Sequence, residues 1–257
     1  MPAAPDLPPM PELDDTDLQT LARAGADALL ESGLVAIPTD TQYALSVLAS
    51  RGDAVMHCYA VKQRPDSEAM PVFISSLDDL DTVATGVDDG VRELAASAWP
   101  GSLTLVLPKN PDWHSLAVPS KTVAVRVPDH PVALAVLEAV GEPITGSSAN
   151  RHSEPPAATS IDVRRTFSTE VETHEVMILP DMGSAPQGTA STILDCTSAP
   201  PRIVRAGAVS DAEVERLLAE HLPSEDPEQD LPDAAGLEAS PDASAEADTA
   251  APTPDRD

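Results

Sequence analysis

Hydrophobic and polar positions along the chain form segments with the two periods that distinguish helices from strands. Apolar residues spaced three and four apart predict amphipathic helices, and short apolar runs that end in proline or a polar turn predict buried strands. Helices are expected over 16–33, 53–62, 77–84, 88–97, 130–140, 160–167 and 210–221. Strands are expected over 34–38, 71–75, 103–108, 122–128, 175–180, 191–196 and 202–205, with a further strand running into Gly146.

Two of the predicted helices begin at capping signals. Thr16 with Gln19, and Ser210 with Glu213, have the spacing of a capping box, and Gly33 is expected to end the first helix. Helices and strands mix without strict alternation or internal repeats. We therefore expect one α/β (α+β) domain built around a twisted, mixed β-sheet with flanking helices.

The two ends of the chain differ in composition from its middle. Residues 1–15 are rich in proline, and residues 223–257 contain eleven acidic residues, one arginine and few large apolar side chains. Segments of this kind cannot bury enough apolar surface to offset the entropy lost on ordering. We therefore expect disorder in both segments and a folded domain over 16–222.

Charge restricts the possible partners. The formal net charge is −28, and residues 18–222 alone hold 27 acidic and 14 basic residues, a charge of −13. A broad electrostatic surface for nucleic acid is therefore not expected, although a local basic pocket could bind a phosphate. No apolar run reaches the roughly 18 residues of a membrane span, and the first residues lack the pattern of a signal peptide. A cytoplasmic protein without membrane contact is expected.

Motifs for several kinds of catalysis are absent. Cys58 and Cys196 fit no metal or redox spacing, so we expect buried free thiols and no metal site. The segment "GSAPQGT" (183–189) has the glycine spacing of a P-loop, but Thr189 stands where the lysine belongs. No dinucleotide fingerprint, H-E-x-x-H pair or G-x-S-x-G turn is present.

The remaining candidates are polar groups at the ends of predicted elements. Lys62 and Arg64 leave a helix together and could approach one anion from two sides, or they could be solvated surface charges. "PTDT" (38–41) closes a buried strand with two hydroxyls and a carboxylate, and it could bind a ligand or only cap a turn. Arg126 interrupts an apolar run, so we expect it to reach a cleft in which it has a partner.

The segment "PITGSSAN" (143–150) joins an apolar strand to a turn of small residues. Small side chains let backbone N–H and hydroxyl donors come close to a phosphate, which bulky side chains would block. Ser148 and Asn150 could alternatively do no more than cap the turn.

Seven motifs in order resemble those of the YrdC/Sua5 family, the L-threonylcarbamoyladenylate synthases. They are "VAIPTDTQYALS", "KQRP", "WPGSLTLVL", "VAVRVPDHP", "SSAN", "STILD" and "IVRAGAV". The resemblance covers about 20–210 and implies a single YrdC-like domain of the short type, with a concave face that binds ATP, L-threonine and bicarbonate. The longer Sua5 branch carries an extra C-terminal domain.

The resemblance also implies a nucleotidyltransferase reaction. The threonine amine takes up CO₂ from bicarbonate, and the resulting carbamate attacks the α-phosphorus of ATP, which is accompanied by Mg²⁺. Threonylcarbamoyl-AMP and pyrophosphate form, and the first passes to a tRNA threonylcarbamoyl transferase complex for t6A modification at position 37. Direct tRNA binding by this acidic chain is not expected. Such chemistry depends on positioning and charge neutralisation more than on a strong base.

Residue roles follow from the matched motifs. Catalysis by neutralising the reacting anions is assigned to Lys62 and Arg64. Threonine binding is assigned to Thr39, Arg126 and Ser191, with Arg126 as a fork on the carboxylate. ATP binding is assigned to Thr122, Ser148, Asn150 and Arg205.

The sequence departs from the family pattern "PTDTVYGLG" at three positions. Gln42 replaces an apolar residue, and Ala44 and Ser46 replace glycines. If the first glycine needs a positive φ, Ala44 would cost about 1 kcal/mol or move the loop. Two alternative functions stand beside the enzyme. The concave surface of the fold leaves open an RNA-binding or ribosome-maturation module, and the changed loop leaves open a family member that binds nucleotide without turnover.

Overall fold

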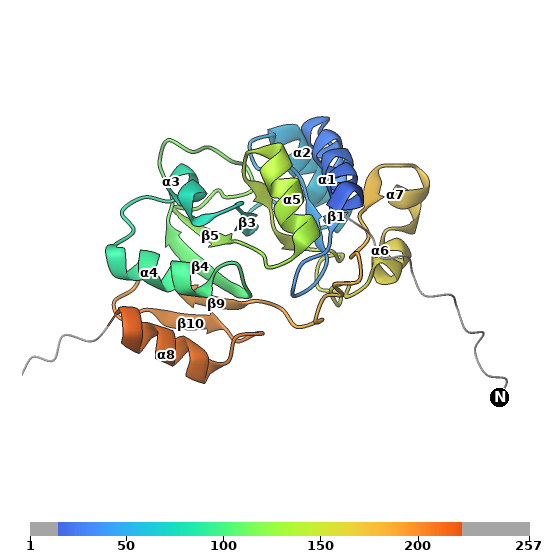
Figure 1. Cartoon of the computed structure of the whole chain (residues 1–257). Coiled ribbons are helices and arrows are strands. Elements are labelled where there is room, and N and C mark those ends of the chain that lie inside the picture. The colour runs from blue at the N-terminus through green and yellow to red at the C-terminus, as the bar shows by residue number, and fades with distance from the viewer. Residues whose placement is uncertain (1–14, 223–257) are drawn as a thin grey trace, which may run out of the picture. The chain divides into compact units, whose positions relative to one another are not determined.

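The computed structural model describes residues 15–222, which form two mixed β-sheets with helices around them (Figure 1). The helices are α1 (Asp15–Leu30), α2 (Gly52–Lys62), the 3₁₀ turn η1 (Leu77–Asp79), α3 (Leu80–Val83), α4 (Asp89–Ala98), α5 (Pro131–Val140), α6 (Ser160–Thr166), α7 (Ser168–Glu172) and α8 (Asp211–His221). The strands are β1 (Leu34–Ile37), β2 (Ala44–Ser46), β3 (Val72–Phe73), β4 (Leu103–Pro108), β5 (Thr122–Arg126), β6 (Ile144–Thr145), β7 (Ser147–Ser148), β8 (Val176–Ile178), β9 (Thr192–Asp195) and β10 (Arg202–Arg205).

The strands divide between a smaller and a larger sheet. The smaller sheet has the order β7–β2–β1–β8, in which β1 and β8 run parallel and the other pairs antiparallel. The larger sheet has the order β10–β9–β4–β5–β3–β6, with parallel pairs β9–β4 and β5–β3. The predicted mixed α/β fold is confirmed, although its strands form two sheets where the pattern suggested one.

The chain crosses from the larger sheet to the smaller one at Gly146, which separates β6 from β7. A Cβ atom at this position would lie 2.4 Å from the ring of Phe73, a separation that carbon atoms cannot adopt without a shift. Next to the crossing, the Thr145 N–H donates to the Val47 carbonyl at 2.9 Å and ties the two sheets together. Glycine is needed here for close approach.

The sequence of strand β1 is continuously apolar because both faces of the strand are buried. Its four residues are all buried, and successive side chains point to opposite faces of the sheet. Leu34 and Ala36 join the core cluster that includes α2, α4 and α8, whereas Val35 and Ile37 join the cluster beneath α1 and α5. Helices α1 and α5 pack side by side over this second cluster (Figure 1).

Most predicted elements are present, and three short ones were not predicted. The strands at 103–108 and 202–205 have the predicted bounds, whereas β2, β7 and α7 have five residues or fewer and escaped the pattern. Helix α1 begins at Asp15, so the prediction that Thr16 caps it is wrong. The helix ends at Leu30, before the predicted Gly33, and Ser32 takes the left-handed conformation with φ of 67°.

Other predictions from the sequence have different outcomes. The Ser210 hydroxyl caps α8 by accepting from the Glu213 N–H at 3.2 Å, as predicted. Both cysteines are free, but Cys196 is only partly buried, which corrects the expectation of two buried thiols. Among residues 15–222, no helix is long and apolar enough to cross a membrane. Of the segments expected to be disordered, 1–14 and 223–257 lie outside the described residues, whereas Asp15, which we placed in the first segment, begins α1.

Candidate functional site

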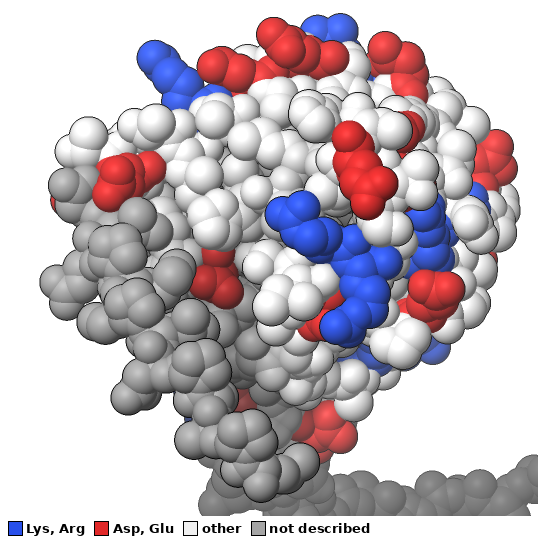
Figure 2. Space-filling model, turned by 90° about the vertical axis from the view of Figure 1, so that its right-hand side faces the viewer, with Lys and Arg blue, Asp and Glu red and all other residues white. Residues whose placement is uncertain are grey.

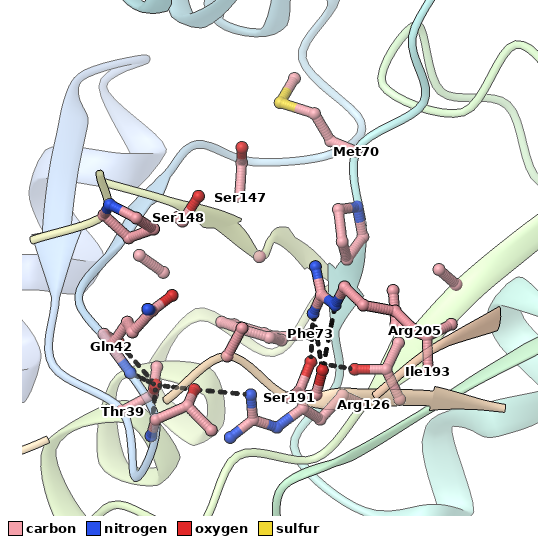
Figure 3. Close-up of a pocket in the computed structure, with 18 of the residues that line it drawn as sticks. Thr39, Gln42, Met70, Phe73, Arg126, Ser147, Ser148, Ser191, Ile193 and Arg205 are labelled. Carbon is pink, nitrogen blue, oxygen red and sulfur yellow. Dashed lines mark hydrogen bonds between the residues drawn. The ribbon is translucent and has the colours of Figure 1, made fainter. Parts of the chain in front are cut away.

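Segments far apart in the sequence meet around a cavity of ≈ 300 Å³ (Figure 3). The wall is formed by residues from 39–44 and 146–148 on the side of the smaller sheet, and from 69–73 and 190–193 on the side of the larger sheet. Arginines 64, 126 and 205 also line it. The cavity thus lies where the two sheets approach each other.

Arg126 lies at one side of this cavity and is almost fully buried. It forms an ion pair with Asp40, and it donates through Nη1 to Thr41 Oγ1 at 2.9 Å and through Nε to the Gly101 carbonyl at 2.7 Å. Burial lowers the pKa of Arg126, and the charge of Asp40 opposes this effect. The three bonds leave one N–H on each terminal nitrogen of the guanidinium. We expected a partner for Arg126 from the sequence, and the structure shows that this partner is Asp40, which we did not name from the sequence.

The Thr39 hydroxyl folds the turn that follows β1. It accepts hydrogen bonds from the N–H groups of Thr41 and Gln42, both at 3.2 Å, and lies 2.6 Å from the Gln42 carbonyl, to which it donates. Thr39 also lines the cavity. The turn cap predicted as one interpretation of "PTDT" is therefore present, and it forms part of the cavity wall, whereas ligand binding stays a prediction.

Ser191 and Arg205 also line the cavity, and Ser191 lies beside Arg126 (Figure 3). The Arg205 guanidinium donates to the Ser191 hydroxyl at 2.9 Å and to the Ser191 carbonyl at 2.8 and 3.1 Å. The Ser191 hydroxyl also lies 2.9 Å from the hydroxyl of Thr104 on β4. This network connects β4, β9 and β10 and fixes the direction in which Arg205 enters the site.

Arg64 reaches the cavity from the turn that follows α2. Its Nη2 donates to the Ala69 carbonyl at 3.0 Å and lies 3.4 Å from the Glu68 carboxylate. The side chain remains partly exposed, so this ion pair is screened by solvent and weak. An anion that enters the cavity could therefore compete with Glu68 for the Arg64 guanidinium.

Lys62 lies behind the wall of the cavity and is 2% exposed. Its ammonium donates to the carbonyls of Ser148 and Asn150, the latter at 2.8 Å. Burial lowers its pKa from 10.5 to about 8, with the neighbouring charges of Arg64 and Arg151 adding to the effect. Lys62 thus holds the backbone of 147–150 in place, and its ammonium is directed at that backbone.

The structure brings six of the nine predicted site residues to the cavity wall. These are Thr39, Arg64, Arg126, Ser148, Ser191 and Arg205. Lys62, Thr122 and Asn150 are not part of the lining. The side-chain amide of Asn150 is used within its own loop, where it accepts from the Ser148 hydroxyl at 2.6 Å and donates to the Arg151 and Glu154 carbonyls at 2.8 Å.

The lining groups favour anions over a resident metal ion. Three guanidinium groups line the cavity, and no Asp or Glu side chain does. Within residues 15–222, no cluster of three or more His, Cys, Asp or Glu side chains could hold a metal ion. Protein sites for Mg²⁺ usually supply one or two carboxylates. These lining residues therefore do not fit a resident Mg²⁺.

The departures from the family glycines cause no backbone strain. Ala44 and Ser46 lie in β2, and neither has a positive φ. The condition under which Ala44 would have been costly is therefore not met. Gln42 donates through its side-chain amide to the Gly188 carbonyl at 2.9 Å and connects the Thr39 turn to 181–190.

Comparisons with known proteins agree with this geometry. The family model Sua5_yciO_yrdC, described as "Telomere recombination", matches residues 27–207. A Bacillus subtilis protein named threonylcarbamoyl-AMP synthase is 34% identical over 209 residues, which cover 80% of this chain and 58% of the relative. A Mycobacterium leprae protein named putative threonylcarbamoyl-AMP synthase is 37% identical over 207 residues, which cover 79% and 91% respectively.

A solved structure shares the fold. The crystal structure of P. abyssi Sua5 complexed with L-threonine superposes with a TM-score of 0.73 at 32% identity, covering 79% of this chain and 58% of that chain. The fold and the arginine-lined cavity place the protein in the class of the YrdC-like domains. The chain belongs to the Sua5/YciO/YrdC family, and it spans 58% of the length of the B. subtilis relative.

Proposed function

We propose that this chain is a nucleotidyltransferase that forms threonylcarbamoyl-AMP and pyrophosphate from L-threonine, bicarbonate and ATP. The observation that carries the proposal is the convergence of three arginines and several hydroxyls from separate family motifs on one cavity. It is supported by the names of the relatives and by the L-threonine bound in P. abyssi Sua5. Both reactants that approach each other in this reaction are anions, so cationic groups must offset their repulsion.

The cavity offers complementary groups for the two substrates. Arg126 keeps one free N–H on each terminal nitrogen and would hold the threonine carboxylate as a fork, with Thr39 and Ser191 shaping the wall beside it. Arg64 and Arg205 would neutralise the carbamate and the phosphates. The Ser148 hydroxyl, which donates to Asn150 Oδ1 in this structure, would turn to donate to nucleotide phosphate, where small side chains permit close approach.

In this account the chain acts chiefly by positioning. The carbamate oxygen forms a bond to the α-phosphorus while the bond to the β-phosphate oxygen breaks, and pyrophosphate leaves with the electron pair. Lys62 contributes through 147–150, whose carbonyls it fixes from behind. Mg²⁺ enters with ATP and screens the phosphate charge.

The proposal includes a place in the cell and a route for the product. A cytoplasmic chain would pass threonylcarbamoyl-AMP to a transferase that modifies tRNA, without binding tRNA itself. The charge of −13 on residues 18–222 disfavours an RNA-binding module. On the face that carries α6 and α7, basic side chains lie among acidic ones (Figure 2). The alternative of a family member without turnover was suggested by the changed loop, and the unstrained backbone of that loop gives it no support.

The test is pyrophosphate release from the purified full chain, with threonine, bicarbonate or ATP omitted in turn. We expect release only when all three are present. Arg205→Ala should lower turnover about tenfold or more, because one charge-assisted contact to phosphate is lost. Arg202→Ala is the matched control, since Arg202 lies on the same strand and is 71% exposed in its side chain. Threonine-independent release, or equal rates in both variants, would refute the proposal.

A further inference from the structure

Arg151 directly follows 147–150 and has no role in the family motif that we matched. Its side chain turns away from the cavity, and it is not among the lining residues. Nη1 donates to the Val61 carbonyl near the end of α2, and Nη2 donates to the Glu170 carboxylate on α7 at 2.7 Å. The guanidinium also lies over the ring of Phe167, 4.8 Å from its centroid.

The partners of Arg151 are themselves fixed. Phe167 is fully buried, and the Glu170 side chain is 14% exposed. One carboxylate oxygen of Glu170, Oε2, is buried without a hydrogen-bond partner, so Arg151 is the group within 15–222 that offsets its charge. Removing either partner of such a pair is costly, because the other charge is left without compensation.

The end of α2 also holds the backbone of 148–152, independently of Arg151. The Lys62 carbonyl accepts from the His152 N–H at 2.7 Å, while the Lys62 ammonium donates to the carbonyls of Ser148 and Asn150. The last carbonyls of a helix lack partners within the helix and favour cations. Arg151 and Lys62 therefore clamp 147–152 to α2 from the side opposite the cavity.

We propose that Arg151, held by Glu170 and Phe167, is a positioning residue that fixes 147–150 and thereby sets Ser148, which lines the cavity, for contact with nucleotide phosphate. The inference rests on the proposed function and extends it to α7, which carries Glu170 and contributes nothing to the cavity wall. Small displacements of a positioned group can reduce rates by large factors. Loss of the clamp should therefore affect ATP more than threonine, whose carboxylate is held by Arg126.

The experiment compares Arg151→Ala, Arg151→Lys and Glu170→Gln with the wild-type full chain. We expect Arg151→Ala and Glu170→Gln each to raise the KM for ATP about tenfold and to change the KM for threonine by less than about twofold. The KM for ATP of the double variant should not exceed that of the more impaired single variant, because both substitutions act through one contact. Arg151→Lys keeps the charge but not the fork, so it should restore part of the loss. Arg165→Ala is the control for charge, since Arg165 is 76% exposed in its side chain and should leave both KM values unchanged.

Titration calorimetry with a non-hydrolysable ATP analogue separates this inference from the proposed function. Reduced analogue affinity in Arg151→Ala and Glu170→Gln supports the inference even if the wild type releases no pyrophosphate. A lower melting temperature with unchanged analogue affinity and unchanged KM for ATP would overturn it, since Arg151 would then serve stability alone. Glu170→Gln keeps the shape of the side chain and decides the question if Arg151→Ala does not fold.

Discussion

Replacing Lys62 by methionine tests whether burial of its charged ammonium destabilises the folded state. Burial and nearby arginines lower the pKa of Lys62 from 10.5 to about 8. At about 1.4 kcal/mol per pH unit, keeping this group charged costs the folded state about 3 kcal/mol at neutral pH. Methionine removes that cost, but it leaves the carbonyls of Ser148 and Asn150 without a donor, at about 1–3 kcal/mol each.

The two effects can be separated by pH. Below the folded pKa of about 8 both states of the wild type hold the proton, so the cost of the buried charge is present in full. Between about 8 and 10.5 the unfolded chain binds more protons than the folded protein, and wild-type stability therefore rises with pH. The neutral amine still donates to the loop. We expect the free energy of unfolding of the wild type, relative to Lys62→Met, to increase by about 2 kcal/mol from about pH 7.5 to about pH 9.5.

Urea denaturation of both proteins at these pH values measures the difference, and other titrating groups cancel because the two chains share them. Lys121→Met is the control, since Lys121 is exposed and its replacement should give curves parallel to the wild type. If Lys62→Met also ran parallel to the wild type over this range, the lysine would not be the buried, destabilised charge that the structure describes.

Three further predictions concern the walls of the site. Gly146→Ala should destabilise the fold by about 1–3 kcal/mol in urea denaturation, because its Cβ would meet the Phe73 ring at 2.4 Å. Asp40→Asn should cost about 3 kcal/mol in the same assay, since it leaves the buried guanidinium of Arg126 without a counter-charge. Ser148→Val should reduce ATP affinity about ten- to a hundredfold in calorimetry, through a lost hydrogen bond and added bulk, and should affect threonine binding less.

Each of these variants has a control. Phe73→Leu removes the ring edge and should recover part of the loss in Gly146→Ala, which a purely conformational effect of the alanine would not allow. Glu213→Gln breaks the exposed pair with Arg216, which solvent screens, and should leave stability nearly unchanged, in contrast to Asp40→Asn. If Ser148→Val melted lower but bound ATP normally, Ser148 would only cap its turn.

The fold was predictable wherever burial produces a clear period. The strand at 103–108 is apolar along most of its length. The apolar residues of helices α4 and α8 recur at helical spacing and indicate which face of each helix is buried. Strands β2 and β7 were missed because three or fewer residues carry no period, and they exist through pairing with distant strands. The division into two sheets depends on the crossing at Gly146, which only the packing against Phe73 explains.

Most residues of the site could be predicted from the sequence, but their arrangement in space could not. The motifs indicated which side chains converge, and Arg126 was expected in a cleft because a buried arginine needs a partner. Nothing local distinguishes Arg64, which faces the cavity, from Lys62, which faces the backbone of 147–150. That difference depends on carbonyl groups brought to α2 from far along the chain. The same is true of Arg151 and Glu170.

The most direct test of the central claim is the fate of isotopically labelled bicarbonate. The full chain would be incubated with Mg·ATP, L-threonine and ¹³C-bicarbonate, and the products analysed by mass spectrometry. The account predicts threonylcarbamoyl-AMP that carries the label in its carbamoyl carbon, with an equal amount of pyrophosphate, and formation of both products about tenfold or more slower in Arg205→Ala. A folded protein that binds ATP but forms no labelled adenylate would contradict it.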